Sequence, residues 1–416
     1  MDMLPIASYP SIVEEFLPKM KQDFSKPQLE NFAKYLTGLM ICDKKNITAI
    51  NNAFVGHKDQ SALNNWLTDS PWSDEKLEKA RKELAKEELD AKNIKHGVLI
   101  VDDTINHKTG KHIEGVNIHF DHSEGKTTLG HQLVTTHLAA GKYSVPIDFE
   151  LFQRDEGQSD FQSKNDLAKQ LIAKAATAGF SFDCVVSDVW YFNYDNTSYI
   201  ESLHKDWVMG CKINRLIQIG NNYVSLCEYL KTVPQEAFKK VTVKTQEGER
   251  SFWTYAKNVT LKTHHQRVRV VFSYEDKVEG EPKVLATNRL QWDVKTILET
   301  YLLRWRIDAF YRDAKQALGL EDSEVRKLCG SKRHWLMVFL ADTLLQFNPK
   351  AERLVERVKV GFETVGSTCR YAATEVLRSF IGLVMRLAQK LKTADDILKY
   401  SLSNLKEIKR LYQMDI

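Results

Sequence analysis

The sequence has no long apolar run: nowhere do about 18 apolar residues follow one another, so we expect no transmembrane helix. Its first residues, MDMLPIASYPSIVEEF, carry acids early and lack the basic start and apolar centre of a secretory signal peptide. Cysteine is sparse, with 6 in 416 residues and no CxxC pair. Scattered cysteines without a pairing motif are typical of free thiols in a reducing compartment. We therefore expect a cytoplasmic protein with no membrane partner.

A large excess of charge of one sign is also absent. The 59 Lys and Arg residues nearly balance 55 Asp and Glu residues, for a net charge of +4, which excludes a wholly basic chain. Any nucleic-acid surface must therefore be a local patch. The distribution is uneven, because residues 250–416 contain 30 basic against 20 acidic residues, which leaves a net charge of −6 for residues 1–249. The C-terminal 40% is thus where we expect a polyanion to lie.

What remains is the composition of an ordinary globular protein, 43% hydrophobic and 27% charged. Its length favours two or three domains. Six of the twelve histidines fall within residues 107–137, but their spacing matches neither an HExxH helix nor a zinc finger. We expect these histidines to lie on the surface and on strand faces.

The pattern changes several times along the chain. Helical spacing, as in Leu29, Phe32, Leu36 and Met40, is followed after Gly97 by short β-branched runs. We predict an α/β core with one mixed sheet, flanked by helical regions at both ends. The predicted regions are 1–95 (helical, DNA binding or dimer contact), 96–206 (first part of the core), 207–289 (β-rich insertion), 290–330 (core helix) and 331–416 (helical).

Two apolar runs of the predicted core end in aspartate. Asp102 ends the run GVLIVD, and Asp188 ends CVVSD. An acid at the carboxyl end of a strand points to the rim of a sheet, where ligands bind. The alternative is that each aspartate only caps a turn, as strand-end aspartates often do.

A third acid lies on the predicted helix around Ile307. At 100° per residue, one face collects apolar residues, and the opposite face collects an acid, three basic residues and two aromatic residues. That second face consists of Tyr301, Arg304, Trp305, Asp308, Arg312 and Lys315. A solvated face with salt bridges would explain most of this, but basic and aromatic residues together also suit a nucleic-acid backbone with an unstacked base. Asp102, Asp188 and Asp308 together would suit two Mg²⁺ ions at a phosphodiester.

The spacing of this helix resembles a known signature. Tyr301, Arg304, Asp308 and Lys315 match the Tyr-x2-Arg-x3-Glu-x6-Lys motif of IS4-type DDE transposases, and the Arg-Trp-Arg-Ile core is Tn5-like. Asp102-Asp103-Thr104 and residues 186–191 resemble the first and second aspartate motifs of that superfamily. The leader Ser70-Pro71-Trp72 and Leu318-Gly319-Leu320 are similar to the IS701 branch. One departure is that Asp308 stands where the family has Glu, with Glu299 and Asp313 as fallback candidates.

The resemblance implies a ribonuclease-H-like core. It implies that Asp102, Asp188 and Asp308 are catalytic and hold two Mg²⁺ ions, for which Mn²⁺ would substitute. It further implies a set of DNA-contacting residues, namely Tyr301, Arg304, Trp305, Arg312, Lys315, Trp190 and Tyr191. The implied protein is a bacterial, nucleoid-associated homodimer.

The implied function is cut-and-paste transposition, with inverted-repeat ends and target DNA as partners. Two alternatives stay open. One is a catalytically impaired, domesticated DNA-binding derivative or repressor, and the other is a metal-dependent nuclease without strand transfer.

Overall fold

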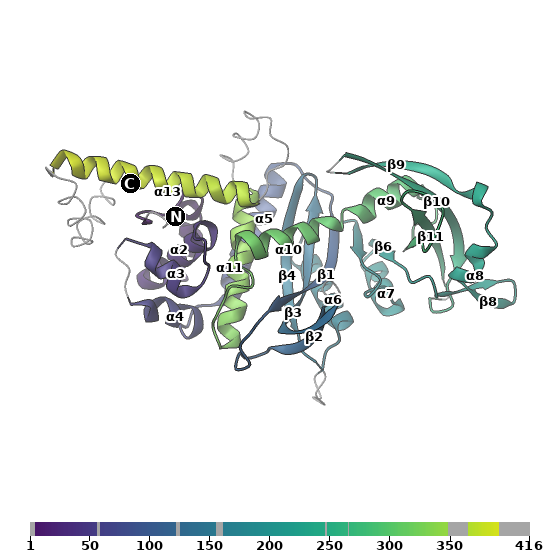
Figure 1. Cartoon of the computed structure of the whole chain (residues 1–416), viewed down its shortest axis with the longest axis horizontal. Coiled ribbons are helices and arrows are strands. Elements are labelled where there is room, and N and C mark those ends of the chain that lie inside the picture. The colour runs from purple at the N-terminus through teal and green to yellow at the C-terminus, as the bar shows by residue number, and fades with distance from the viewer. Residues whose placement is uncertain are drawn as a thin grey trace. The chain divides into compact units, whose positions relative to one another are not determined.

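The computed structural model describes residues 5–55, 59–121, 125–154, 161–245, 248–264, 266–347 and 365–390 (Figure 1). The predicted helical region 331–416 is therefore described only in part. No helix in these ranges is long and apolar enough to cross a membrane, and none of the six cysteines is in a disulfide.

The chain forms two compact units, neither of which is contiguous in sequence. The helical unit comprises residues 1–88, 106–116 and 311–416, and the sheet unit comprises residues 89–105 and 117–310. The five regions expected from the sequence follow composition rather than packing, and their boundaries stay a prediction.

The sheet unit is built on one large mixed sheet whose strands follow the order β2-β3-β1-β5-β6-β12-β11-β10-β9, with β4 paired to β3. Its strands are β1 (Val98–His107), β2 (Asn117–Asp121), β3 (Lys126–Ala140), β4 (Tyr143–Phe152), β5 (Cys184–Ser187), β6 (Asp206–Gly210), β9 (Lys239–Thr245), β10 (Gly248–Thr260), β11 (Arg267–Tyr274) and β12 (Lys283–Thr287). A separate hairpin contains β7 (Leu216–Ile219) and β8 (Asn222–Ser225).

The predicted mixed α/β core is confirmed by the pairing of these strands. β1, β5 and β6 are parallel neighbours, whereas β3 and β4 form an antiparallel hairpin on the other side of β1. That order is the one expected of a ribonuclease-H-like sheet. The β-rich segment that follows extends the same sheet, because β12 pairs antiparallel with β6 and is followed by β11, β10 and β9.

The sheet unit also contains helices. They are α6 (Lys164–Thr177), α7 (Tyr194–Ser202), α8 (Leu226–Lys231), a 3₁₀ turn η1 (Gln235–Ala237) and α9 (Val294–Leu302), followed by the first turns of α10 (Trp305–Ala317). α6 contacts β3 and β4 through its apolar face, which includes Leu167 and Leu171. It begins with a capping box in which Ser163 and Asp166 exchange hydrogen bonds. This fixes the first residue of α6, Lys164, at the edge of the site described below.

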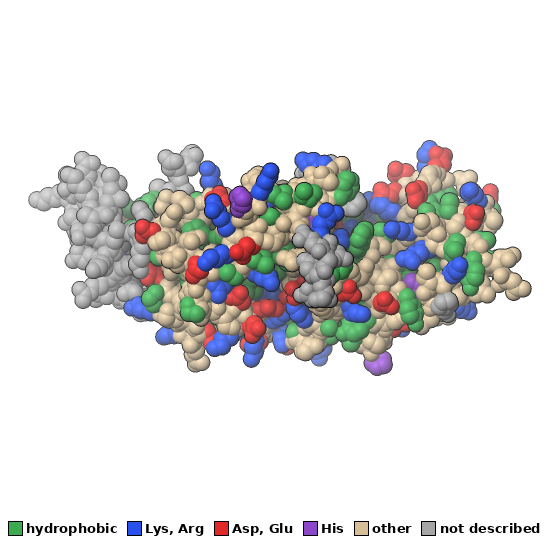
Figure 2. All heavy atoms as spheres, turned by 90° about the horizontal axis from the view of Figure 1, so that it is seen from below, with side chains coloured by type: hydrophobic (Ala, Val, Ile, Leu, Met, Phe, Trp, Pro, Cys, Tyr) green, Lys and Arg blue, Asp and Glu red, His purple; other side chains and the backbone are tan. Residues whose placement is uncertain are grey.

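The helical unit contains α1 (Ser11–Met20), α2 (Lys26–Ile41), α3 (Ile47–Ala53), α4 (Gln60–Thr68), most of α5 (Asp74–Ala91), α11 (Leu328–Gln346) and α13 (Val365–Lys390). Its core is aromatic: Trp66 and Trp72 stack with ring centroids 5.2 Å apart, and Phe32 and Trp335 are fully buried. α5 is strongly charged along its whole length. Basic and acidic side chains are interspersed over the face drawn in Figure 2.

Close packing of α2 against α3 depends on Gly38. A β-carbon at this position would overlap the side chain of Ile50, which is fully buried. We expect Gly38→Ala to lower the free energy of unfolding by about 1–3 kcal/mol, because the two helices must separate to admit the methyl group. Gly382→Ala is the matched control, because Gly382 lies inside α13 with nothing within 4 Å of such a β-carbon. Gly382→Ala should raise the free energy of unfolding by about 0.5–1 kcal/mol, because alanine favours the helix over glycine. Urea unfolding measures both, and equal effects would contradict this packing.

Candidate active site

The parallel pairing of β1 with β5 brings two aspartates to adjacent positions. The register joins Val98 to Cys184 and continues to Val101 and Ser187, the last paired residues. Asp102 and Asp188 are the next residues on each strand. The expectation that both apolar runs end as strands is wrong in one respect, since β1 continues to His107. It is the partner strand β5 that ends, and this leaves Asp102 at an open edge of the sheet.

Arg304 joins the first aspartate to the third candidate acid. Its Nη1 lies 2.5 Å from Oδ2 of Asp102, and its Nη2 lies 3.4 Å from Oδ2 of Asp308. The Arg304 side chain is only 17% exposed, so this charge is largely removed from solvent. All three residues belong to the sheet unit. The structure therefore brings Asp102 to Arg304 and Asp308, which lie about 200 residues later in the sequence.

The helix predicted to carry Arg304 and Asp308 is interrupted. The sequence analysis treated residues 301–315 as one helix, but α9 ends at Leu302 and α10 begins at Trp305. The amides of Leu303 and Arg304 donate to the carbonyls three residues earlier, at 3.3 and 2.9 Å. Such tight turns alter the 100° spacing. Arg304 lies in this break, and its guanidinium contacts Asp102 on β1 and Asp308 on α10.

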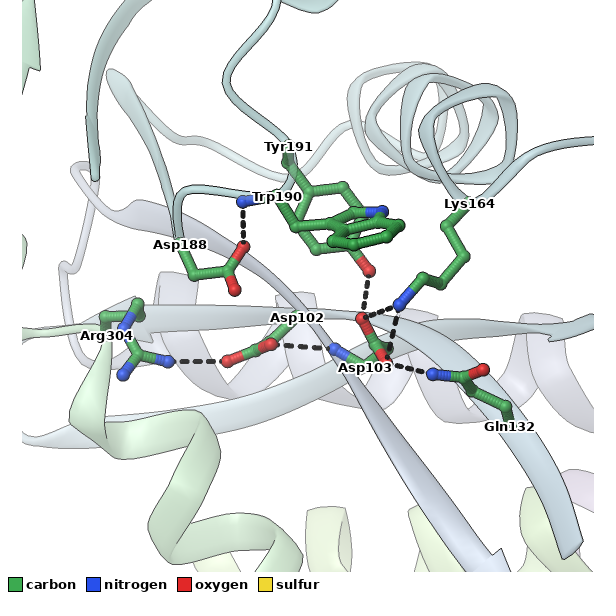
Figure 3. Close-up of polar contacts among 8 residues, drawn as sticks. All are labelled: Asp102, Asp103, Gln132, Lys164, Asp188, Trp190, Tyr191 and Arg304. Atoms are coloured by element: carbon green, nitrogen blue, oxygen red, sulfur yellow. Dashed lines mark hydrogen bonds and ion pairs between the residues drawn. The ribbon is translucent and has the colours of Figure 1, made fainter. Parts of the chain in front are cut away.

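One oxygen of each strand aspartate is held by a backbone amide (Figure 3). The amide of Asp103 donates to Oδ1 of Asp102, and the amide of Trp190 donates to Oδ1 of Asp188, each at 2.9 Å. These bonds fix the orientation of both carboxylates. The remaining oxygens, Oδ2 in each case, are the ones available to a ligand or, for Asp102, to Arg304.

Burial raises the pKa of all three acids. It raises the pKa of Asp102 to about 8, opposed by Arg304 and reinforced by the nearby charges of Asp188 and Asp103. It also raises the pKa of Asp188, opposed by the Trp190 amide, and of Asp308, opposed by Arg304. Each shift means that the ionised form is under-compensated. Burial therefore opposes the ionisation of these acids more than Arg304 and the backbone amides favour it.

Asp103 is held by three side chains, whereas Asp102 accepts from one backbone amide and from Arg304. It accepts hydrogen bonds from Gln132, Lys164 and Tyr191. Sequence reasoning recorded Asp103 only as part of the Asp-Asp-Thr pattern and missed Gln132 and Lys164 entirely. No sequence signal marks these two, because they come from β3 and α6, far along the chain.

The predicted aromatic DNA contacts behave differently from one another. Trp190 and Trp305 are 49% and 50% exposed, so both rings are accessible. Tyr301 is partly buried, and burial raises its pKa. The Tyr301 hydroxyl lies close to the backbone of Gly210, because a β-carbon on Gly210 would be 3.2 Å from it. Tyr191 is a correction: its ring is 1% exposed and its hydroxyl donates to Asp103, so it cannot present its ring to DNA.

The remaining candidates are engaged elsewhere. Arg312 and Lys315 lie on the later turns of α10, which belong to the helical unit, where they pair with Asp313 and Glu321. The fallback acid Glu299 accepts from the amide of Lys244 on β9. Asp313, the other fallback, is the partner of Arg312. Neither fallback acid contacts Asp102 or Arg304.

Comparison with known proteins bears on this site. Residues 19–223, about half of the chain, match the family described as DDE superfamily endonuclease. The matched residues contain both strand aspartates and their register. The chain belongs to the DDE superfamily. The match stops before α9, so it does not extend to Asp308.

Two further similarities were found for this DDE superfamily chain. The "Probable transposase for insertion sequence element IS701" of Microchaete diplosiphon is 29% identical over 223 residues, which cover 52% of this chain and 57% of that protein. The chain thus aligns with little more than half the length of this relative. The cryo-EM structure of a piggyBac transposase synaptic complex with hairpin DNA matches with a TM-score of 0.49 and 8% identity, covering 95% of this chain and 82% of the other.

Divalent metal ions are the cofactors of the DDE endonuclease family, and the acids of this chain fit such an ion. Asp102 and Asp308 both contact Arg304, Asp188 directly follows the last residue of β5 paired with β1, and Oδ2 of Asp308 is buried without a hydrogen bond from any described residue. Carboxylate oxygens are the ligands that hard divalent cations take. In the described ranges no three acids, histidines or cysteines are yet arranged to hold one ion together. The physical reason is that the Arg304 guanidinium lies between Asp102 and Asp308.

The charge strain at this site is testable through Asp188. Asp188→Asn keeps the side-chain shape and the bond from Trp190 while removing the charge. Because burial raises the folded-state pKa of Asp188 above its unfolded value, ionisation opposes folding increasingly as the pH rises from about 4 to the folded pKa. We expect the variant to have a higher Tm than wild type at pH 8 in EDTA. Each kcal/mol of ionisation cost that the substitution removes should raise the Tm by about 2–4 °C. The difference should vanish towards pH 4.

Thermal unfolding at several pH values measures this difference. Glu299→Gln serves as the control, because Glu299 is an acid on α9 whose side chain is 38% exposed and accepts a hydrogen bond from the Lys244 amide. If Asp188→Asn were less stable than wild type at pH 8, the aspartate would be acting as an ordinary stabilising carboxylate.

Proposed function

We propose that the chain is a DNA transposase that cleaves at transposon ends in a metal-dependent reaction and joins the freed end to target DNA. One observation carries the proposal: Asp102 and Asp188 follow the last in-register pair of two parallel strands, and Arg304 connects Asp102 to Asp308. The similarity to the IS701 transposase supports the same reading. Because that relative is matched over only 57% of its length, the activity of the whole chain is part of the proposal.

Asp102, Asp188 and Asp308 would hold the metal, which we propose to be two Mg²⁺ ions replaceable by Mn²⁺. When bound, the ions would supply Lewis-acid activation of the attacking oxygen and neutralise charge on the leaving oxygen. The role of the chain is to present three oxygen-donor side chains. The Asp103 and Trp190 amides support that role by orienting Asp102 and Asp188.

Arg304 would exchange one partner for another. Its guanidinium occupies Oδ2 of Asp102 at 2.5 Å, and that oxygen cannot serve a metal ion and Arg304 at once. A DNA phosphate offers the guanidinium an alternative pair of oxygens in bidentate geometry. The arriving phosphate would therefore draw Arg304 away as the acids become available.

Side chains of both units would contact the DNA. Trp190 and Trp305 would stack on an unpaired base at the transposon end. Tyr301, Arg312 and Lys315 would contact phosphates. Two transposon ends must be brought together, so we propose a homodimer, with residues 1–95 serving DNA binding or dimer contact. A cytoplasmic, nucleoid-associated location is consistent with these partners.

The function is tested by cleavage of duplexes taken from the DNA that flanks the gene. We expect wild-type protein with Mg²⁺ to nick and join these ends. Asp102→Asn, Asp188→Asn and Asp308→Asn should each lose more than about 100-fold in rate, because changes to residues that merely orient metal ligands already cost 10–100-fold. Glu299→Gln, a matched acid on α9 outside the site, should cleave normally. Sequencing gels give the nicked and joined products.

Each failure has a distinct meaning. Full cleavage by Asp308→Asn would refute the assignment of the third acid. Binding without nicking by wild-type protein would support the repressor alternative, and nicking without joining would support a nuclease.

If Arg304 and a metal ion compete for Asp102, removal of the guanidinium should raise the affinity for the metal. Arg304→Gln should bind Mn²⁺ more tightly than wild type without DNA, by roughly fivefold or more, since a coupling of 1–3 kcal/mol is typical between linked ligands. Arg312→Gln is the control, because Arg312 is a half-exposed arginine paired with Asp313. Titration followed by the electron paramagnetic resonance of free Mn²⁺ measures the affinity. An unchanged or weaker affinity in Arg304→Gln would contradict the competition.

A further inference from the structure

A second polar cluster lies beside the three candidate acids. Asp103 accepts hydrogen bonds from Nε2 of Gln132 at 2.6 Å, from Nζ of Lys164 at 3.1 and 3.2 Å, and from the hydroxyl of Tyr191 at 2.7 Å (Figure 3). We call these four residues the Asp103 cluster. The side chains of Asp103 and Lys164 are only 16% and 13% exposed. Three protein side chains donate to the two oxygens of Asp103, so its carboxylate is held within the protein.

The donors of the Asp103 cluster come from three separate elements. Gln132 is on β3, Lys164 is the first residue of α6, and Tyr191 follows β5. Asp103 itself is on β1. One carboxylate therefore connects β1 to β3, to α6 and to the segment 188–191. In a site of low exposure, several charge-assisted hydrogen bonds to one carboxylate restrict the positions of all its partners.

Each end of the Tyr191–Asp103 bond is next to a candidate metal ligand. At one end, the backbone amide of Asp103 holds Oδ1 of Asp102. At the other, the segment 188–191 contains the Trp190 amide that holds Oδ1 of Asp188. The side-chain bond from Tyr191 to Asp103 is thus a bridge between the two segments that orient the two aspartates. It lies just beyond the point where β1 and β5 stop pairing.

Lys164 makes this arrangement electrostatically possible. Asp103 adds a negative charge next to Asp102 and Asp188, and this charge contributes to the raised pKa of both. The ammonium of Lys164 offsets it at 3.1 Å, and the same ammonium lies 4.3 Å from the centre of the Trp190 ring. Lys164 therefore contacts the acid at one end of the bridge and the aromatic residue next to Asp188 at the other.

We propose that the Asp103 cluster is a positioning device that holds Asp102 and Asp188 in the relative orientation a divalent cation requires, with the Tyr191–Asp103 hydrogen bond as the link between them. Its members do not touch the metal or the DNA. The inference deepens the proposed function and rests on it. It also assigns different roles to two adjacent aspartates, since Asp102 is a ligand and Asp103 orients ligands.

The test is the Mn²⁺ affinity of Tyr191→Phe, measured without DNA by the electron paramagnetic resonance of the free ion. This variant keeps the buried ring and removes only the hydroxyl. We expect affinity to fall about 10-fold, the lower end of the range for residues that orient metal ligands. Asp103→Asn should lose more Mn²⁺ affinity, because an amide has only one acceptor oxygen and its NH₂ group cannot accept from Gln132, Lys164 or Tyr191.

Tyr229→Phe is the matched control, because the Tyr229 hydroxyl makes one 2.8 Å bond to Tyr255, away from the acids. Both tyrosine variants should lose similar thermal stability, but only Tyr191→Phe should lose Mn²⁺ affinity. Wild-type affinity in Tyr191→Phe, or equal losses in both variants, would overturn the positioning role. Asp188→Asn is the reference: if it binds Mn²⁺ like wild type, the metal site is wrong and both proposals fall.

Discussion

The candidate active site depends on one constraint, the parallel register of β1 with β5. Hydrogen bonding from Val98–Cys184 to Val101–Ser187 leaves the next two residues, Asp102 and Asp188, side by side at the edge where β5 stops. Both strands lie inside the core, because the consecutive residues Leu99, Ile100, Val185 and Val186 are fully buried on both faces of the sheet, as is typical of parallel strands. Packing of the core thus determines where the acids lie.

The second constraint is electrostatic. Gathering Asp102, Asp188 and Asp308 in a poorly solvated place opposes their ionisation, and Arg304 offsets only part of the cost. Residues elsewhere in the fold stabilise this arrangement, as the amides of Asp103 and Trp190 do. Such strain at a site is typical of groups arranged for a ligand rather than for stability.

Much of the core could be predicted from local sequence, and the finer geometry could not. The apolar runs that end at Asp102 and Asp188 indicated strands, and together with the neighbouring strand and helix patterns they predicted a mixed sheet. The break between α9 and α10 was missed, because Leu302 to Trp305 contains no Gly or Pro to mark it. The partners of Asp103 were missed for another reason: Gln132 and Lys164 are about 30 and 60 residues away and are brought to Asp103 only by the tertiary fold. The burial of Tyr191 was equally invisible, since a tyrosine beside an exposed tryptophan carries no sign of which one points inward.

The interleaving of the two units affects how this protein can be cut or recombined. The chain passes between them at residues 88, 105, 116 and 310, and a short excursion into the helical unit separates β1 from the rest of the sheet. A contiguous fragment of 117–310 would contain Asp188 and Arg304 but leave Asp102 behind. A single gene segment that carries the whole site must therefore encode all residues from β1 to α10. That architecture favours transmission of the chain as a whole rather than as interchangeable modules.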